Sequence, residues 1–179
     1  MNGPDNRKQT RRLRRPTPAG VALAVCVLLI TVRLLTNRER PSAKPDPSSG
    51  RSVLVSRVLD GDTLETSAGE RIRLLGINAP EVAHHDQQGE PYGAEATDWL
   101  QERLQGKRVV LVTEEREFDM YGRTLAWVYD GQGKLINEEL LETGNARLLP
   151  DFGLPAGLEV QLYQAEARAS VARLGIWKK

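Results

Sequence analysis

The stretch "VLDGDTLETSAGERIRLLGINAPE", residues 58–81, decides the fold of this chain. Apolar and polar residues on both sides of "SAGE" favour two strands joined by a turn within residues 63–77. The turn "DGD" closes an earlier strand over residues 52–59. The region therefore predicts three consecutive strands, and it gathers four polar residues near their ends: Asp62, Arg73, Asn78 and Glu81.

The chain beyond this region continues with helix and strand patterns. Leu100 and Leu104 share one face of a helix expected over residues 94–106, with Gly106 as its stop. The further expected elements are strands at residues 107–115 and 122–130 and helices at residues 137–144 and 157–175, after which "IW" folds back. Five strands with a helix after the third predict an α+β fold, in which an OB-type five-stranded β-barrel carries about three helices.

The charge of the chain is unevenly distributed. The net charge of the 179 residues is +1. Residues 1–51 carry 11 Lys and Arg against 3 Asp and Glu, a net +8, and residues 52–179 carry 14 against 21, a net −7. An acidic domain argues against tight nonspecific binding of nucleic acid, unless its basic residues cluster at one cleft.

The front of the chain resembles a targeting segment. We expect a basic region at residues 1–17, a transmembrane signal-anchor or signal peptide at residues 18–35, a flexible linker at residues 36–51 and a folded domain at residues 52–179. The unbroken apolar run is 14 residues, shorter than a span of about 20 residues requires. If Arg33 snorkels to the interface, the segment reaches 18 residues.

Three alternatives remain for this segment: an uncleaved signal-anchor, which we favour, a cleaved signal peptide, and a buried helix of a soluble protein. Six of the first 15 residues are Lys or Arg, which favours an N-terminus in the cytoplasm. The domain would then be anchored on the extracytoplasmic side of the membrane, or secreted if the signal is cleaved. Cys26 is the single cysteine, so no intrachain disulfide is possible.

Six motifs occur in order along the domain: "VLDGDT", "IRLLGINAPE", "YGAEA", "DMYGRTLAWVY", "NEELLETGNA" and "LGIW". This ordered set resembles the staphylococcal nuclease (thermonuclease) family over residues 52–177. The resemblance implies an OB-fold barrel with three helices, and a calcium-dependent phosphodiesterase that hydrolyses DNA, RNA or both. We expect the protein to be monomeric.

The residues agree with such chemistry. Calcium prefers oxygen ligands, which Asp62, Asn78 and the backbone carbonyl of Ala79 can supply. Glu81 can orient or deprotonate a water molecule. The remaining candidates act on the substrate: Arg73 and Arg123 as clamps on the phosphate, and Tyr121 as a hydrogen-bond donor to it or a flank to a base. In the resemblance, the metal positions fall on Asp62 and Asn78, the catalytic glutamate on Glu81 and the two arginines on Arg73 and Arg123.

This chain departs from the pattern of the family at three places. Asn78 stands where an aspartate is expected, and a neutral amide should weaken calcium binding. Ala79 replaces a threonine, a change that a backbone carbonyl ligand would survive. No tyrosine occurs near "GNARLLPDFG", where the family commonly stacks one on a base, and Phe152 is the nearest aromatic residue.

Simpler interpretations exist for each candidate. Asp62 can be a turn residue, Arg73 a partner of Glu65 or Glu70, and Glu81 a solvated loop charge. The order of the motifs favours the nuclease. The alternative is a catalytically weak OB-fold module that binds single-stranded nucleic acid or a protein partner, and the presence of Arg73, Glu81 and Arg123 argues against it. The acidic surface favours only a third class, an extracytoplasmic protein-interaction domain with a relict site.

Overall fold

The computed structural model describes residues 43–83, 88–150 and 153–178. All of them belong to one compact unit, residues 41–179. The expected basic region and the apolar segment at residues 18–35 lie outside the described residues. No helix of the described part is long and apolar enough to cross a membrane.

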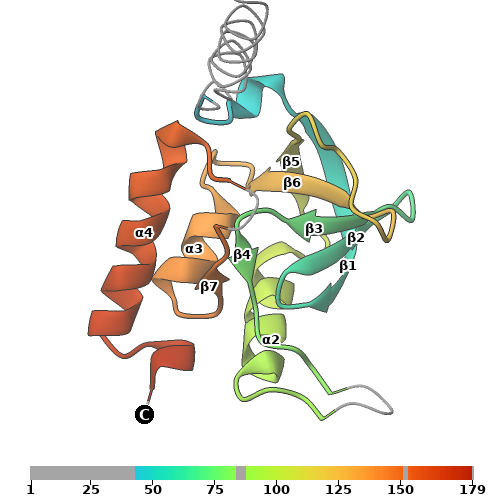
Figure 1. The fold of residues 1–179 in the computed structure, drawn as a ribbon. Coiled ribbons are helices and arrows are strands. Elements are labelled where there is room, and N and C mark those ends of the chain that lie inside the picture. The colour runs from blue at the N-terminus through green and yellow to red at the C-terminus, as the bar shows by residue number, and fades with distance from the viewer. Residues whose placement is uncertain (1–42, 84–87, 151–152, 179) are drawn as a thin grey trace, which may run out of the picture. The chain divides into compact units, whose positions relative to one another are not determined.

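A closed barrel of five strands forms the centre of this unit (Figure 1). The strands are β1 (Arg51–Asp60), β2 (Thr63–Thr66), β3 (Arg71–Leu74), β5 (Arg108–Val112) and β6 (Thr124–Tyr129). Their order around the barrel is β1-β2-β3-β6-β5. Strand β3 pairs with β6 in parallel, and the other four strand pairs of the barrel are antiparallel. The register of β1 against β2 shifts twice, and such irregularities help a strand to bend around a barrel.

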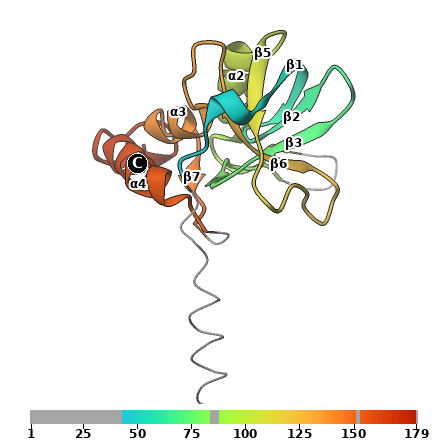
Figure 2. The same ribbon diagram turned by 90° about the horizontal axis from the view of Figure 1, so that it is seen from above.

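Three α-helices accompany the barrel: α2 (Gly93–Leu104), α3 (Ile136–Glu142) and α4 (Ala156–Val171). In α2, the buried residues Ala96, Leu100 and Leu104 recur every four positions, so one face of the helix packs on the barrel. Figure 2 shows α3 and α4 together on the side of the barrel away from β1 and β2. The expected α+β fold with a five-stranded barrel and three helices is confirmed.

A second sheet was not expected. It consists of the short strands β4 (Ile77–Asn78) and β7 (Arg147–Leu148), which pair antiparallel between the barrel and helices α3 and α4 (Figure 1). The strand expected to run to residue 77 ends at Leu74 instead. Gly76 explains the break, because its φ of +69° lies in the left-handed region and a Cβ there would be 2.8 Å from the Trp127 ring.

The end of the expected linker joins the folded unit. Pro45 is buried, and its carbonyl accepts a 2.8 Å hydrogen bond from the hydroxyl of Tyr129. A 3₁₀ turn, η1 (Pro47–Ser49), then leads directly into β1. Residues 43–51 therefore belong to the folded unit in this structure, although their proline and serine content is typical of a linker.

The buried amide of Asn137 ties α3 to the barrel. Its Oδ1 accepts a hydrogen bond from Val128 N at 2.9 Å, and its Nδ2 donates to the Leu75 carbonyl at 2.8 Å. A buried amide of this kind is stable only when its donors and acceptors are paired. The contact fixes the segment between β3 and β4, which leads to the candidate site.

Candidate active site

The turn between β1 and β2 places the first candidate residue. A Cβ on Gly61 would be 2.6 Å from the Cβ of Ala79 and 2.9 Å from the Cβ of Ala96, so only glycine lets the turn approach β4 and α2 so closely. Asp60 shapes this turn, since its Oδ1 accepts a 3.0 Å hydrogen bond from the backbone N–H of Asp62. The turn predicted at "DGD" is therefore present in the structure, and Asp60 stabilises it.

Asp62 is buried, with 6% of its surface exposed. Its Oδ2 accepts a 2.7 Å hydrogen bond from Ala79 N, and its Oδ1 accepts one from the Thr63 hydroxyl at 3.2 Å. Its carboxylate also forms an ion pair with Arg73. Asp62 thus joins the β1–β2 turn, β3 and the end of β4.

Arg73 reaches from β3 toward β4. Its Nη2 donates to Asn78 Oδ1 at 2.8 Å and to the Ile77 carbonyl at 3.2 Å. The simpler interpretation, a surface pair with Glu65 or Glu70, does not occur. Those two carboxylates pair instead with Arg57 and Arg51, respectively.

The electrostatic environment of Arg73 joins it to the remaining candidates. The pKa of Arg73 is lowered to about 10. Burial is the largest cause, and repulsion from the Arg123 guanidinium acts in the same direction, whereas the charges of Asp60, Glu81 and Asp119 oppose the shift. Arg73 is therefore still charged at neutral pH. Two guanidinium groups that repel each other next to carboxylates form a site suited to an anion or to a combination of anion and cation.

Asp60 experiences the same field. Burial raises its pKa above the ordinary value of an aspartate, whereas the Thr63 hydrogen bonds and the two arginines, Arg73 and Arg123, act in the opposite direction. The net shift is upward, so burial outweighs the attraction. Asp60 is thus a second carboxylate close to both arginines.

Glu81 lies at the base of the loop that connects β4 to α2. The loop closes through a 2.8 Å hydrogen bond from Glu90 N to the Glu81 carbonyl, and a Cβ on Gly93 would collide with that carbonyl. The backbone of Glu81 is therefore fixed, although Glu81 as a whole is exposed to solvent. None of the ion pairs found among the described residues uses its carboxylate, which leaves that group available for a water molecule.

Arg123 is held by a tight turn. Its Nε donates to Asp119 Oδ2 at 2.7 Å, and its backbone N–H donates to Asp119 Oδ1 at 2.9 Å. The turn needs Gly122, whose φ is +76°. Tyr121, in the same turn, is 76% exposed, and its ring lies 5.5 Å from the Arg123 guanidinium carbon. The cation is thus positioned beside an exposed aromatic ring.

Partial burial alone would raise the pKa of Asp119. The hydrogen bonds from the backbone and side chain of Arg123 and from the backbone of Tyr121 outweigh burial, and the pKa is lowered overall. Asp119 stays ionised and fixes Arg123. Sequence reasoning did not single out Asp119, although an aspartate that opens a glycine turn four residues before an arginine is a signal for it.

The site residues predicted from the sequence fall into two groups: residues linked by direct contacts, and residues around them. In the first, Asp62 contacts Arg73 and the backbone N–H of Ala79, and Arg73 contacts Asn78. Glu81 and Arg123 act on Arg73 through their charges, and Tyr121 contacts Arg123. Phe152 and the histidine pair His84 and His85 lie outside the described residues.

The oxygen atoms of the candidate metal ligands are of the type that binds a hard cation. Asp62, Asn78 and the Ala79 carbonyl offer only oxygen atoms, the ligands that calcium prefers. Both side chains are in contact with Arg73 in this structure, so a cation bound there would take their oxygens from the guanidinium. Within the described residues, no group of three or more His, Cys, Asp and Glu is arranged to hold a metal.

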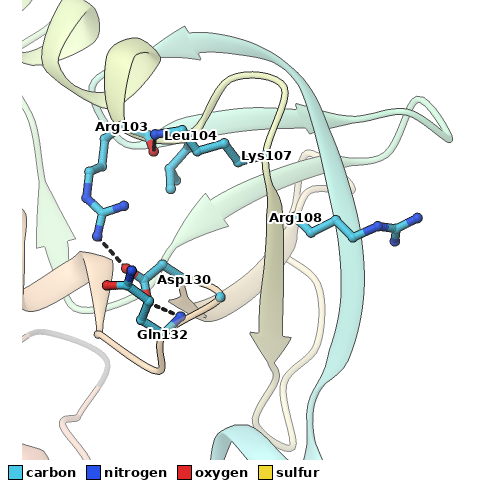
Figure 3. A pocket seen from close by; sticks show the side chains of 7 residues that line it. Arg103, Leu104, Lys107, Arg108, Asp130 and Gln132 are labelled. Carbon is cyan, nitrogen blue, oxygen red and sulfur yellow. Dashed lines mark hydrogen bonds and ion pairs between the residues drawn. The ribbon is translucent and has the colours of Figure 1, made fainter.

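A pocket of about 390 Å³ elsewhere in the molecule is a weaker candidate (Figure 3). It is lined by Arg103, Leu104, Lys107, Arg108, Asp130, Gly131 and Gln132. Arg103 faces Asp130 across it at 2.5 Å and also pairs with Glu139, whereas Arg108 points away. Because Arg103 is paired with Asp130 and Glu139, and Lys107 donates to the Glu102 and Arg103 carbonyls, the charged groups of Arg103, Asp130 and Lys107 already have partners within the fold.

Known proteins resemble this chain over most of its length. It is 31% identical to a thermonuclease of Staphylococcus intermedius over 93% of this chain and 100% of that protein. It is 37% identical to a micrococcal nuclease of Shigella flexneri over 69% of this chain and 71% of that protein. An uncharacterised endonuclease of Escherichia coli O157:H7 is 35% identical over 69% of this chain and 74% of that protein.

The family described as "Staphylococcal nuclease homologue" matches residues 71–179. This range contains β3 with Arg73, the β4 strand, Glu81 and the turn that holds Arg123. The family resemblance noted in the sequence motifs is confirmed. The chain belongs to the staphylococcal nuclease homologue family.

Proposed function

We propose that this chain is a calcium-dependent nuclease that hydrolyses phosphodiester bonds of DNA, RNA or both. The activity class is the best supported part, because the relatives named thermonuclease, micrococcal nuclease and endonuclease agree on a hydrolytic nuclease. The observation that carries the proposal for this site is that Arg73 and Arg123, each fixed by its own hydrogen bonds, lie close enough to repel each other, while the charge of Glu81 also acts on Arg73.

The arginines would bind the phosphate. A phosphodiester carries one negative charge, and the charge on its oxygens grows as a nucleophile adds to phosphorus. The guanidinium of Arg73 is held by Asp62 and Asn78, and that of Arg123 is held by Asp119. Both cations are therefore fixed before the substrate arrives, and the phosphate would relieve their mutual repulsion.

Glu81 would act on the water. Its carboxylate can accept a proton from a water molecule as the oxygen of that water forms a bond to phosphorus. The P–O bond to one sugar then breaks, and the released alkoxide takes up a proton. Calcium, when bound at Asp62, Asn78 and the Ala79 carbonyl, supplies positive charge that stabilises the phosphoryl oxygens.

The direct test is an assay of the full chain on single-stranded DNA with calcium and with excess chelator. We expect cleavage with calcium and its loss with chelator. Arg73→Lys, Glu81→Gln and Arg123→Lys should each lower activity by a factor on the order of 10² or more, because the lysines lose the bidentate guanidinium contact to the phosphate and the glutamine cannot accept a proton. Arg57→Gln, which removes a surface ion pair with Glu65, is the matched control.

Two results would overturn the proposal: full activity in excess chelator, or unchanged activity in Glu81→Gln. Binding of single strands without hydrolysis in all conditions would favour the OB-fold binding module instead.

We also propose that the domain lies on the extracytoplasmic side of a membrane. The support is the basic leader, the apolar run and the linker of the sequence. Protease added to spheroplasts should digest the domain, and washing membranes with high salt should not release the full chain. Full-length protein in the soluble cytosolic fraction would contradict the proposal, and a released fragment that begins between residues 34 and 44 would show a cleaved signal.

A further inference from the structure

Arg147 lies directly opposite a candidate site residue. In the β4–β7 sheet, Arg147 is the register partner of Asn78. Directly opposed residues of an antiparallel pair extend their side chains on the same face of the sheet, with Cβ atoms about 4.5–5.5 Å apart. Because the amide of Asn78 contacts Arg73, the side chain of Arg147 starts on the face that carries the candidate site.

The guanidinium of Arg147 is positioned by an aromatic ring instead of a carboxylate. Its central carbon lies 4.4 Å from the centre of the Trp177 ring. Six other arginines of the described residues pair with carboxylates: Arg51, Arg57, Arg73, Arg103, Arg123 and Arg168. Arg147 is not among them, and it is exposed. A stacked guanidinium keeps its N–H groups at the ring edge, where they can donate to a phosphate.

A second cation and ring extend this surface. The ammonium of Lys178 lies 5.8 Å from the centre of the Tyr92 ring. Tyr92 immediately precedes Gly93, whose backbone is packed against the Glu81 carbonyl. Tyr92 itself has a φ of +71°, an unfavourable conformation for a residue with a side chain and one that is found at functional sites. The stacked residues Arg147, Trp177, Lys178 and Tyr92 therefore run from Asn78 to the loop of Glu81.

The position of Trp177 is built into the fold. The glycines Gly144 and Gly175 pack backbone to backbone, so a Cβ on either would collide with the other turn. Ile176 N donates to the Gly144 carbonyl at 2.9 Å, which brings η2 (Gly175–Trp177) against the segment that leads into β7. The contact explains how a residue near the end of the described chain stacks on Arg147.

We propose that these four residues form a strand-binding track that holds two phosphates of the same nucleic-acid strand next to the scissile one. Arg147 and Lys178 contact the phosphates, and the rings of Trp177 and Tyr92 orient the two cations. The proposal rests on the nuclease function proposed above and adds a second binding site to it. It also explains how an acidic domain can bind a polyanion, because the positive charge is concentrated beside the site.

The test measures how binding of a labelled single-stranded oligonucleotide to the full chain depends on salt, in chelator so that the strand stays intact. Each phosphate contact contributes about 0.7 to the slope of log K against log salt for a single strand. Arg147→Gln should therefore make the magnitude of this negative slope smaller by about 0.7, and the double variant with Lys178→Gln should make it smaller by about 1.4. The basic N-terminal region contributes equally to every variant, so only differences are compared.

Two variants separate binding from structure. Arg147→Lys keeps the charge and should keep most of the slope. Arg168→Gln removes an exposed arginine that pairs with Glu142 and should leave the slope unchanged. A slope equal to that of the wild type in Arg147→Gln would overturn the track, and so would a slope as low in Arg147→Lys as in Arg147→Gln.

A cleavage assay with calcium, run beside the binding measurement in chelator, separates this inference from the proposed function. If the wild-type chain does not cleave DNA with calcium, the nuclease proposal fails, while the slopes still report on Arg147. If it cleaves and the Arg147→Gln slope is unchanged, only the track fails. Thermal unfolding of each variant checks that the fold is intact.

Discussion

At the scale of single residues, the side-chain oxygen of Asn78 can interact either with Arg73 or with calcium. In the structure its Oδ1 accepts a hydrogen bond from Arg73, and the same atom is the proposed ligand of calcium. An aspartate would carry a negative charge that favours both partners. The substitution Asn78→Asp therefore tests whether the side chain at position 78 mainly binds calcium or mainly holds Arg73.

We expect Asn78→Asp to bind calcium more tightly, by a factor on the order of ten, because ligand charge tunes calcium affinity. Calorimetry on the full chain measures this directly. Gln132→Glu, which adds the same charge at the remote pocket, is the control and should leave the calcium affinity unchanged. Equal or weaker binding in Asn78→Asp would mean that residue 78 serves Arg73 alone.

Asp119 gives a pH-dependent contribution to stability. Its pKa is lowered in the folded state, so its contribution is present above the unfolded pKa, about 3.9, and is lost as pH falls through the folded value. We expect Asp119→Asn to be less stable than the wild type at pH 6, with the difference shrinking as the pH falls below about 4. Urea unfolding at several pH values measures it, and a constant difference down to the lowest pH would contradict the assignment.

At the scale of elements, the contact between the turn after α3 and the turn after α4 positions η2. Gly175 has a φ of +50°, and an added Cβ would collide with the Gly144 carbonyl. Gly133 has a φ of +81°, but an added Cβ would have no atom within 4 Å. Comparing alanine substitutions at the two glycines therefore separates two costs in folding free energy: that of the left-handed backbone conformation and that of the steric clash.

Gly133→Ala should lower the free energy of unfolding by about 1–2 kcal/mol, the cost of a left-handed conformation. Gly175→Ala adds an overpacking cost of about 1–3 kcal/mol and should lower the free energy of unfolding by about 2–5 kcal/mol in total. Urea unfolding of both variants makes the comparison. Equal losses would show that the turn yields without strain.

At the scale of the whole molecule, the barrel and the three helices could be predicted because their patterns are local. Leu100 and Leu104, for example, reveal the buried face of α2 by spacing alone. Asp62, Arg73, Asn78 and Ala79 could be placed together because they flank two connected turns. Family order added Arg123, which is distant in sequence.

The β4–β7 sheet could not be predicted in the same way. Two-residue strands have no periodicity, and their pairing depends on Gly76 and on the packing of Trp127. The register of Asn78 with Arg147, and the stack of Arg147 on Trp177, are consequences of that pairing. The sequence predicts that "IW" folds back after the last helix, and the structure shows Trp177 half-buried with the Arg147 guanidinium over its ring.

The pairing of β4 with β7 also has a kinetic consequence. Contacts between segments far apart in the chain form slowly, since the loop between them must close first. A refolding chain should therefore acquire the β2–β3 hairpin before the small sheet that completes the site. In pulse-labelled hydrogen exchange, the amide of Leu74, bonded to the Asp62 carbonyl, should gain protection before that of Leu149, bonded to the Gly76 carbonyl. Simultaneous protection would show instead that the barrel and the site fold in one step. In the expected order, the refolding chain passes through a stage in which Arg73 already faces Asp62 but Arg147 is not yet in place to hold the substrate strand.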